Sequence, residues 1–76
     1  MKELLEYLAR SLVDKPESVS VDVIEGDQSL ILQLHVDPDD VGKVIGKQGR
    51  IAKAIRTIVK ASAVKEGKRA IVEIID

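Results

Sequence analysis

A chain of 76 residues with a net charge of −1 and 45% hydrophobic residues fits one small domain and is too apolar to be disordered. No apolar run is long enough to cross a bilayer, and we expect no membrane partner. The start lacks the basic region and apolar stretch of a signal peptide, and the sequence has no cysteine, so we expect a cytoplasmic protein.

The first half of the chain predicts a helix and then a hairpin. Apolar residues recur at helical spacing at Leu4, Leu5, Leu8, Leu12 and Val13. We therefore expect an amphipathic helix over residues 2–13, ended by the segment 14–17. Alternating apolar residues then predict two strands, with Val19, Val21 and Val23 before the turn at 25–28, and Leu30, Leu32, Leu34 and Val36 after it. Strands joined by so short a glycine-containing turn pair antiparallel, and the leucine face should meet the helices.

The second half predicts two helices and a third strand. Asp37 followed by Pro38 is typical of a helix start, and a short helix should run from there to about Ile45. A longer helix should run to about Ala63, with an inner face made of Ile51, Ile55, Ile58, Val59 and Ser62. After a turn at 65–68, the segment Arg69–Ile75 predicts a strand with apolar groups on both faces.

The expected fold class is α+β, in the order α-β-β-α-α-β. The two middle helices connect the second strand to the third across one face of the sheet, and such a crossover favours a parallel pair. We therefore expect a three-stranded mixed sheet covered by helices on one face. Residues 1–76 should form a single domain.

Charge is distributed unevenly along the chain. The segment Val41–Lys65 has no Asp or Glu and a formal charge of +7, which leaves −8 for the remainder of the chain. Its cations are Lys43, Lys47, Arg50, Lys53, Arg56, Lys60 and Lys65. A solvated helix face normally mixes both signs, so this run indicates a surface that binds an anion.

A four-residue glycine loop lies inside the basic segment. It consists of Gly46, Lys47, Gln48 and Gly49. The glycines allow close approach of another backbone, and Lys47 places a cation at the tip, so a polyanionic strand is the natural partner. A nucleotide-binding P-loop is excluded, because only three residues separate Gly42 from Gly46 and Gln48 replaces the metal-binding hydroxyl. A simple corner between two helices remains the alternative interpretation.

The stretch from Val44 to Gly49, between two helices in this order of elements, resembles the KH domain of RNA-binding proteins in its bacterial type II form. The sequence through Arg56 is similar to that of the small bacterial proteins known as KH domain-containing protein A. This resemblance covers the whole chain. It implies that Gly46, Lys47, Gln48 and Gly49 clamp the backbone of single-stranded RNA. It also implies a bordering groove for the bases, made of Val44, Ile45, Ile51 and Ile55. Electrostatics adds Lys43, Arg50 and Lys53 to the expected interface.

The sequence does not indicate an enzyme, a cofactor or a metal site. His35 stands alone, without a second histidine or a cysteine to share a metal. Asp37, Asp39 and Asp40 are explained by helix capping. We therefore expect no catalytic residues and no bound metal.

A protein-interaction module is the second hypothesis, with the exposed apolar side of the last strand or the first helix pairing two chains. The family resemblance implies a homodimer, or a heterodimer with a second, larger KH-domain protein. It also implies an RNA-chaperone or post-transcriptional role in cell-length and peptidoglycan homeostasis. Single-stranded DNA is an alternative ligand, since no ribose-specific group can be identified.

Overall fold

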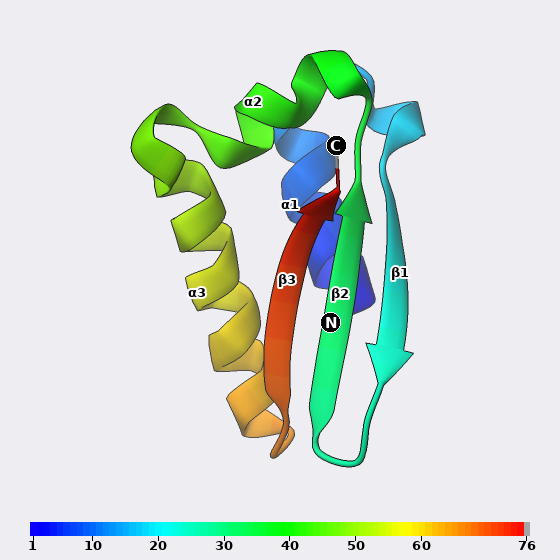
Figure 1. Cartoon of the computed structure of the whole chain (residues 1–76), viewed down its shortest axis with the longest axis vertical. Helices are drawn as coiled ribbons and strands as arrows, with labels where there is room; N and C mark the ends of the chain where they lie inside the picture. Colours follow the sequence, from blue (N-terminus) through cyan, green and yellow to red (C-terminus); the bar gives the residue numbers. More distant parts are fainter. Residues whose placement is uncertain (76) are drawn as a thin grey trace.

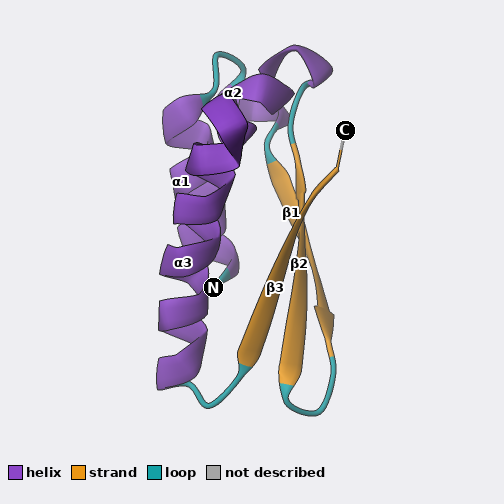
Figure 2. Cartoon of the chain, turned by 60° about the vertical axis from the view of Figure 1, so that its left-hand side comes forward, coloured by secondary structure: helices purple, strands orange, loops and turns teal. Residues whose placement is uncertain are grey.

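Three helices pack against one face of a three-stranded sheet in the computed structural model, which describes residues 1–75 (Figures 1 and 2). The elements are α1 (Lys2–Leu12), β1 (Ser20–Glu25), β2 (Ser29–His35), α2 (Val41–Ile45), α3 (Arg50–Lys65) and β3 (Arg69–Ile75). Short 3-10 turns occupy Pro16–Ser18, Pro38–Asp40 and Lys47–Gly49. This arrangement confirms the α+β class and the α-β-β-α-α-β order.

The sheet is mixed, with the order β1-β2-β3. β1 pairs antiparallel with β2, and β2 pairs parallel with β3, as the hairpin and the crossover predicted. At the turn end of the hairpin, the amide of Arg69 donates a hydrogen bond to the carbonyl of Gln28 at 2.9 Å. The crossover through α2 and α3 places both helices beside α1, on the same face of the sheet (Figure 2).

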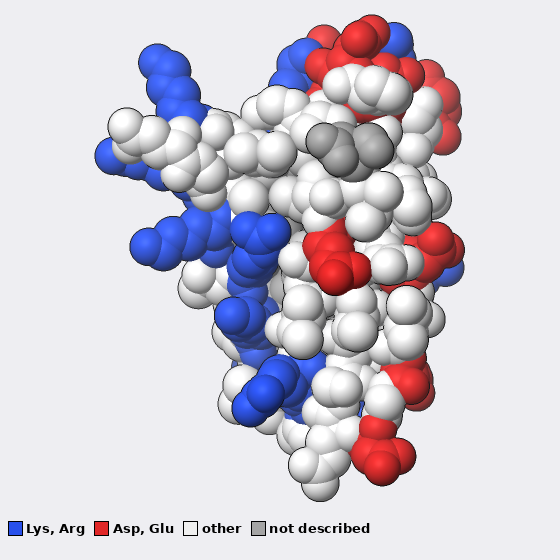
Figure 3. All heavy atoms as spheres, viewed as in Figure 1, with Lys and Arg blue, Asp and Glu red and all other residues white. Residues whose placement is uncertain are grey.

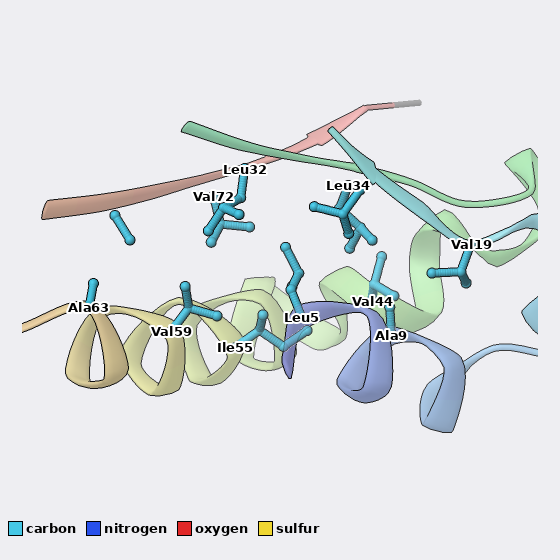
Figure 4. Packing of buried hydrophobic residues seen from close by; sticks show 12 residues of the cluster. Leu5, Ala9, Val19, Leu32, Leu34, Val44, Ile55, Val59, Ala63 and Val72 are labelled. Atoms are coloured by element: carbon cyan, nitrogen blue, oxygen red, sulfur yellow. The ribbon is translucent and has the colours of Figure 1, made fainter. Parts of the chain in front are cut away.

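The core lies between the helices and this face of the sheet (Figure 4). Its members are Leu5, Ala9, Val19, Val21, Leu32, Leu34, Val44, Ile55, Val59, Ala63, Ala70 and Val72. Leu32 and Leu34 are fully buried and Leu30 is 5% exposed, so the leucine face of β2 meets the helices as expected.

Three apolar residues that the patterns placed inside are exposed. Leu12 lies at the last position of α1, and Val23 lies on β1 near the turn, so both are at the ends of the packed region. Ile58 was expected on the inner face of α3 but is 45% exposed. That face instead includes Ala52 and Ala63, whose small side chains let the helix lie close to its neighbours.

The opposite face of the sheet has no helix over it (Figure 2). His35 lies there, with Nε2 3.0 Å from Oδ2 of Asp22. Within residues 1–75, no helix is both long and apolar enough to cross a membrane. The same residues contain no group of three or more His, Cys, Asp or Glu side chains that could hold a metal ion.

Candidate nucleic-acid interface

The glycine loop forms the corner between α2 and α3, at the upper left in Figure 1. Three of its four residues have positive φ angles: Gly46 at 75°, Gln48 at 58° and Gly49 at 72°. The amide of Gly49 donates to the carbonyl of Gly46 at 3.2 Å and closes the turn. Lys47 and Gln48 are exposed at its tip.

The two glycines are needed for different reasons. A Cβ built on Gly46 would lie 2.5 Å from Cγ1 of Ile51, and the backbone there has φ 75° and ψ 176°, a region that essentially only glycine occupies. Gly49 has φ 72° and ψ 16°, which is ordinary left-handed helical geometry, and a Cβ on it would meet nothing within 4 Å. Gly46 is therefore restricted by both space and conformation, whereas Gly49 is restricted by conformation alone.

Asp40 ties the segment that follows α1 to the start of α2. Its side chain is 1% exposed and accepts hydrogen bonds from the amides of Asp14 at 3.3 Å and Lys15 at 3.0 Å. The Lys43 ammonium lies 3.4 Å from Oδ1 of Asp40 and 3.0 Å from Oδ2 of Asp14. This network was not foreseen, because the sequence explained Asp40 as a helix cap. Asp37 does act as a helix cap, because its side chain accepts a hydrogen bond from the amide of Asp39 at 2.9 Å.

The same contacts shift the pKa values of the groups involved. Burial opposes ionisation of Asp40, but the amides of Lys15 and Asp14 and the Lys43 ammonium outweigh it, so the pKa of Asp40 lies below its usual 3.8. Hydrogen bonds to the carboxylates of Asp14 and then Asp40, together with their negative charges, raise the pKa of Lys43. Hydrogen bonding and attraction from Asp39 and Asp37 raise the pKa of Lys15.

The cations of the basic segment differ in how free they are. Lys43 forms ion pairs with the carboxylates of Asp14 and Asp40, and its side chain is 43% exposed. Among the residues that the structure describes, Lys47, Arg50 and Lys53 form no ion pair and their side chains are exposed. Figure 3 shows Lys and Arg side chains gathered in a column over α3 and its border with β3, with the acidic side chains elsewhere on this face.

The aliphatic residues expected to border a groove separate into two pairs. Val44 and Ile55 are 0% and 3% exposed and belong to the core, so their side chains are not at the surface. Ile45 is 37% exposed, and Ile51 is partly buried against the core beside Gly46. The structure thus brings Ile45 and Ile51 to the surface beside the loop and places Val44 and Ile55 in the core beneath it.

Arg56 adds a contact that the helical pattern did not reveal. Its Nε donates to the carbonyl of Val72 at 3.2 Å, from α3 to the outer edge of β3. A free strand edge presents unpaired backbone groups, and this contact occupies one of them. Arg56 therefore holds the border between α3 and β3 together. A positive charge at that helix position was visible in the sequence, but its acceptor was not.

The family model described as "KhpA/KhpB, KH domain" matches residues 2–74. The chain belongs to the KhpA/KhpB family of KH domains. It is 67% identical over 75 residues to the RNA-binding protein KhpA of Clostridium perfringens, covering 99% of this chain and 100% of that one. It is 49% identical over 76 residues to the RNA-binding protein KhpA of Aquifex aeolicus, covering 100% and 96%. Membership of this non-enzymatic family confirms that the chain is not an enzyme.

Two solved structures share the fold. Aquifex aeolicus Era bound to GDP.AlF4- superposes with a TM-score of 0.63 and 21% identity. Era in complex with MgGDPNP and nucleotides 1506–1542 of 16S ribosomal RNA gives 0.64 and 21%. Each match covers 96% of this chain and 28% of the Era chain, so the chain spans about a quarter of that protein. With the family match, these likenesses support the expected type II KH fold.

Replacing glycines by alanine should separate the two constraints on the loop. We expect Gly49→Ala to lower the free energy of unfolding by about 1–2 kcal/mol, the cost of left-handed geometry for an alanine. Gly46→Ala should lower it more, because overpacking against Ile51 adds about 1–3 kcal/mol. Gly42→Ala, in α2 with open space around its Cβ, is the control and should be neutral or stabilising. Urea unfolding measures all three, and equal losses at Gly46 and Gly49 would contradict the close contact.

Acidification should reveal the Asp40 network. Because the folded pKa of Asp40 is depressed, its stabilisation is complete above the ordinary pKa of 3.8 and is lost as the pH falls below that value. Asp40→Asn should lower the melting temperature at pH 7, since an amide has one acceptor oxygen for two amide donors. It should also flatten the decline below pH 4. Asp27→Asn, at an exposed carboxylate in the hairpin turn, is the control. Parallel acid profiles for Asp40→Asn and the parent would refute the assignment.

Proposed function

We propose that this chain binds single-stranded RNA through the loop Gly46–Gly49. The observation that carries the proposal is the loop itself, a glycine corner with an exposed lysine at the tip and exposed cations beside it. Relatives with up to 67% identity over their whole length carry the name RNA-binding protein KhpA. A KH domain clamps about four nucleotides in this way. We assign this role to one KH domain over residues 1–76.

The sugar-phosphate backbone would cross the loop. The absence of a side chain at Gly49, where a Cβ would meet nothing within 4 Å, leaves the main chain open to a phosphate, and the exposed Lys47 supplies a cation. Gln48 offers an amide that can donate or accept. Arg50 and Lys53, exposed on the first turns of α3, extend the positive surface along the strand.

Bases would lie against the aliphatic groups beside the loop. Among the aliphatic residues expected at the groove, Ile45 is exposed and Ile51 is partly exposed. Val44 and Ile55 act from below, by supporting the helices that present the loop. Lys43 also acts indirectly, since its ammonium fixes the start of α2 through Asp40 and Asp14.

Replacing Lys47 and Gln48 together by Asp tests the clamp. Two carboxylates at the tip repel phosphates, so we expect the double variant to lose binding of a single-stranded RNA oligonucleotide in fluorescence anisotropy. Its circular dichroism and melting temperature should stay close to those of the parent, because both side chains are exposed. Parent affinity should fall as salt rises, because counterions are released.

The control variant carries the same change of charge elsewhere. Lys2 and Ser18 are exposed on α1 and on the turn before β1, and Lys2→Asp with Ser18→Asp should bind as the parent does. Equal binding by the clamp variant and the parent would show that the loop is not the site. Titration with single-stranded DNA and duplex RNA under the same conditions distinguishes RNA from the alternative ligands.

Chain pairing is a second proposed function, supported by the open face of the sheet. The strand register aligns Ile24 with Ile31 and Ile31 with Ile71, so three isoleucines form one row across β1, β2 and β3. Ile24 is 50% and Ile71 43% exposed. An apolar row of this kind suits a second copy or the larger KH-domain protein that the family resemblance implies. A role as an RNA chaperone or post-transcriptional regulator in cell-length and peptidoglycan homeostasis rests on that resemblance.

Sedimentation equilibrium at micromolar protein tests the pairing. We expect a parent dimer and a monomer for Ile24→Lys, because a buried ammonium in an apolar contact is costly. Tyr7→Lys, at a 70% exposed position on α1, is the matched change on the other layer and should leave the dimer intact. A monomeric parent would exclude self-pairing, and dissociation by Tyr7→Lys alone would move the contact to the first helix.

A further inference from the structure

The two edges of the sheet differ in how far they are covered. The edge at β3 borders α3, and the carbonyl of Val72 there accepts a hydrogen bond from Arg56. The edge at β1 lies on the opposite side of the sheet, and no helix of residues 1–75 lies beside it (Figure 1). β1 also has neither a bulge nor a proline, two features that commonly protect a free edge. Such an edge is a template for pairing with another extended chain.

The ladder between β1 and β2 determines which backbone groups of β1 point outward. The amide of Gly26 donates to the carbonyl of Ser29 at 2.8 Å, so these two residues form a hydrogen-bonded pair next to the turn. Hydrogen-bonded and non-hydrogen-bonded pairs alternate along an antiparallel ladder. Counting from this pair, every second residue of β1 bonds to β2, and the residues between them direct both N–H and C=O away from the sheet. The outward residues are Val21, Val23 and Glu25.

These outward groups are available to a partner strand. Within residues 1–75, they form no hydrogen bond. An antiparallel strand exchanges two hydrogen bonds with each outward residue. The side chains of Val23 and Glu25 are exposed on one side of β1, and that of Asp22 is exposed on the other. A partner strand therefore meets an apolar group and two carboxylates as well as the backbone.

The charge around β1 selects a cationic partner. From residue 16 to residue 40 the chain has no Lys or Arg and a formal charge of −7. Its acids are Glu17, Asp22, Glu25, Asp27, Asp37, Asp39 and Asp40. Figure 3 shows Asp and Glu side chains down the side of the molecule on which β1 lies, opposite the column of Lys and Arg. A second copy of β1 would add the same carboxylates to this edge, and like charges across a strand pair are destabilising. A polynucleotide is repelled for the same reason.

We propose that the outer edge of β1 binds an extended cationic segment of a partner protein, which joins the sheet as a fourth, antiparallel strand. Backbone hydrogen bonds to Val21, Val23 and Glu25 hold the segment in place. Lys or Arg residues opposite Asp22 and Glu25, and an apolar residue opposite Val23, give the contact its specificity. This edge is separate from the glycine loop and from the open face of the sheet, so it requires neither of the functions proposed above.

Hydrogen exchange with a designed peptide tests the strand addition. The peptide Lys-Ile-Val-Lys-Val, blocked at both ends, places its residues in that order opposite Glu25, Ile24, Val23, Asp22 and Val21. At saturating peptide, exchange of the outward amides should slow by about tenfold or more, as measured by NMR. The amides of Asp22 and Ile24 already bond to β2 and should change little. Binding should weaken as salt rises, because exposed charges are screened.

Two altered peptides separate backbone pairing from charge. Methylation of the nitrogen of the central valine removes the donor to the carbonyl of Val23 and keeps both cations, so the methylated peptide should not slow exchange. Replacing both lysines of the peptide by glutamate keeps the backbone and reverses the charge. This acidic peptide should not bind the parent.

Protein variants test the same edge from the other side. Val23→Pro removes an outward N–H and leaves the bonds to β2 in place, so it should retain the circular dichroism of the parent and lose the peptide. Glu25→Lys, at an exposed position, should weaken the basic peptide by about fivefold and allow the acidic one to bind. Glu66→Lys makes the same change of charge at the turn between α3 and β3 and should bind as the parent does.

Three results would overturn the proposal. Failure of the parent to bind the basic peptide would show that the edge is not a binding site. Equal binding of the methylated peptide would reduce the contact to attraction between charges. Protection of the outward amides that rises with protein concentration, without any peptide, would assign the edge to a second copy of the chain.

Discussion

The contact between the backbone of Gly46 and the side chain of Ile51 sets the corner on which the interface depends. Ile51 also packs against the core, so the first turn of α3 cannot shift without disturbing packed side chains. Any larger residue at position 46 would have to displace Ile51. The positions of Lys47, Arg50 and Lys53 therefore follow from a close approach that only glycine permits. A phosphate-binding surface gains from this because its groups are already in place before the ligand arrives.

Asp40 adds a second restraint on the other side of α2. Its carboxylate satisfies two amides at the end of α1 and meets the Lys43 ammonium, so a buried acid is stabilised by three donors. The chain of net charge −1 presents a basic surface because the segment Val41–Lys65 has no Asp or Glu. Several of its acids are engaged with Lys15 and Lys43 on one side, whereas the cations of α3 remain exposed on the other.

Two surfaces of α3 serve different purposes. Its buried side, which includes Ala52 and Ala63, brings the helix close to the rest of the fold. The side of α3 that faces β3 carries positive charge from the loop to the α3–β3 turn. There the Nε–H of Arg56 donates a hydrogen bond to the edge of the sheet rather than to solvent. The border between helix and strand thus becomes a basic track. The open face of the sheet, with its row of isoleucines, is left for a different contact.

The sequence by itself determined the order of elements, the mixed sheet and the glycine corner, because periodicity, capping and turn chemistry act between near neighbours. It identified Gly46–Gly49 and the positive run around them. Tertiary structure decided which apolar residues face inward, because Ala52 and Ile58 lie on opposite flanks of the apolar stripe of α3 and the packing buries only the flank with Ala52. It placed Val44 and Ile55 in the core and gave Asp40 and Arg56 partners distant in the chain. Such contacts depend on how whole elements pack, and no local pattern encodes that packing.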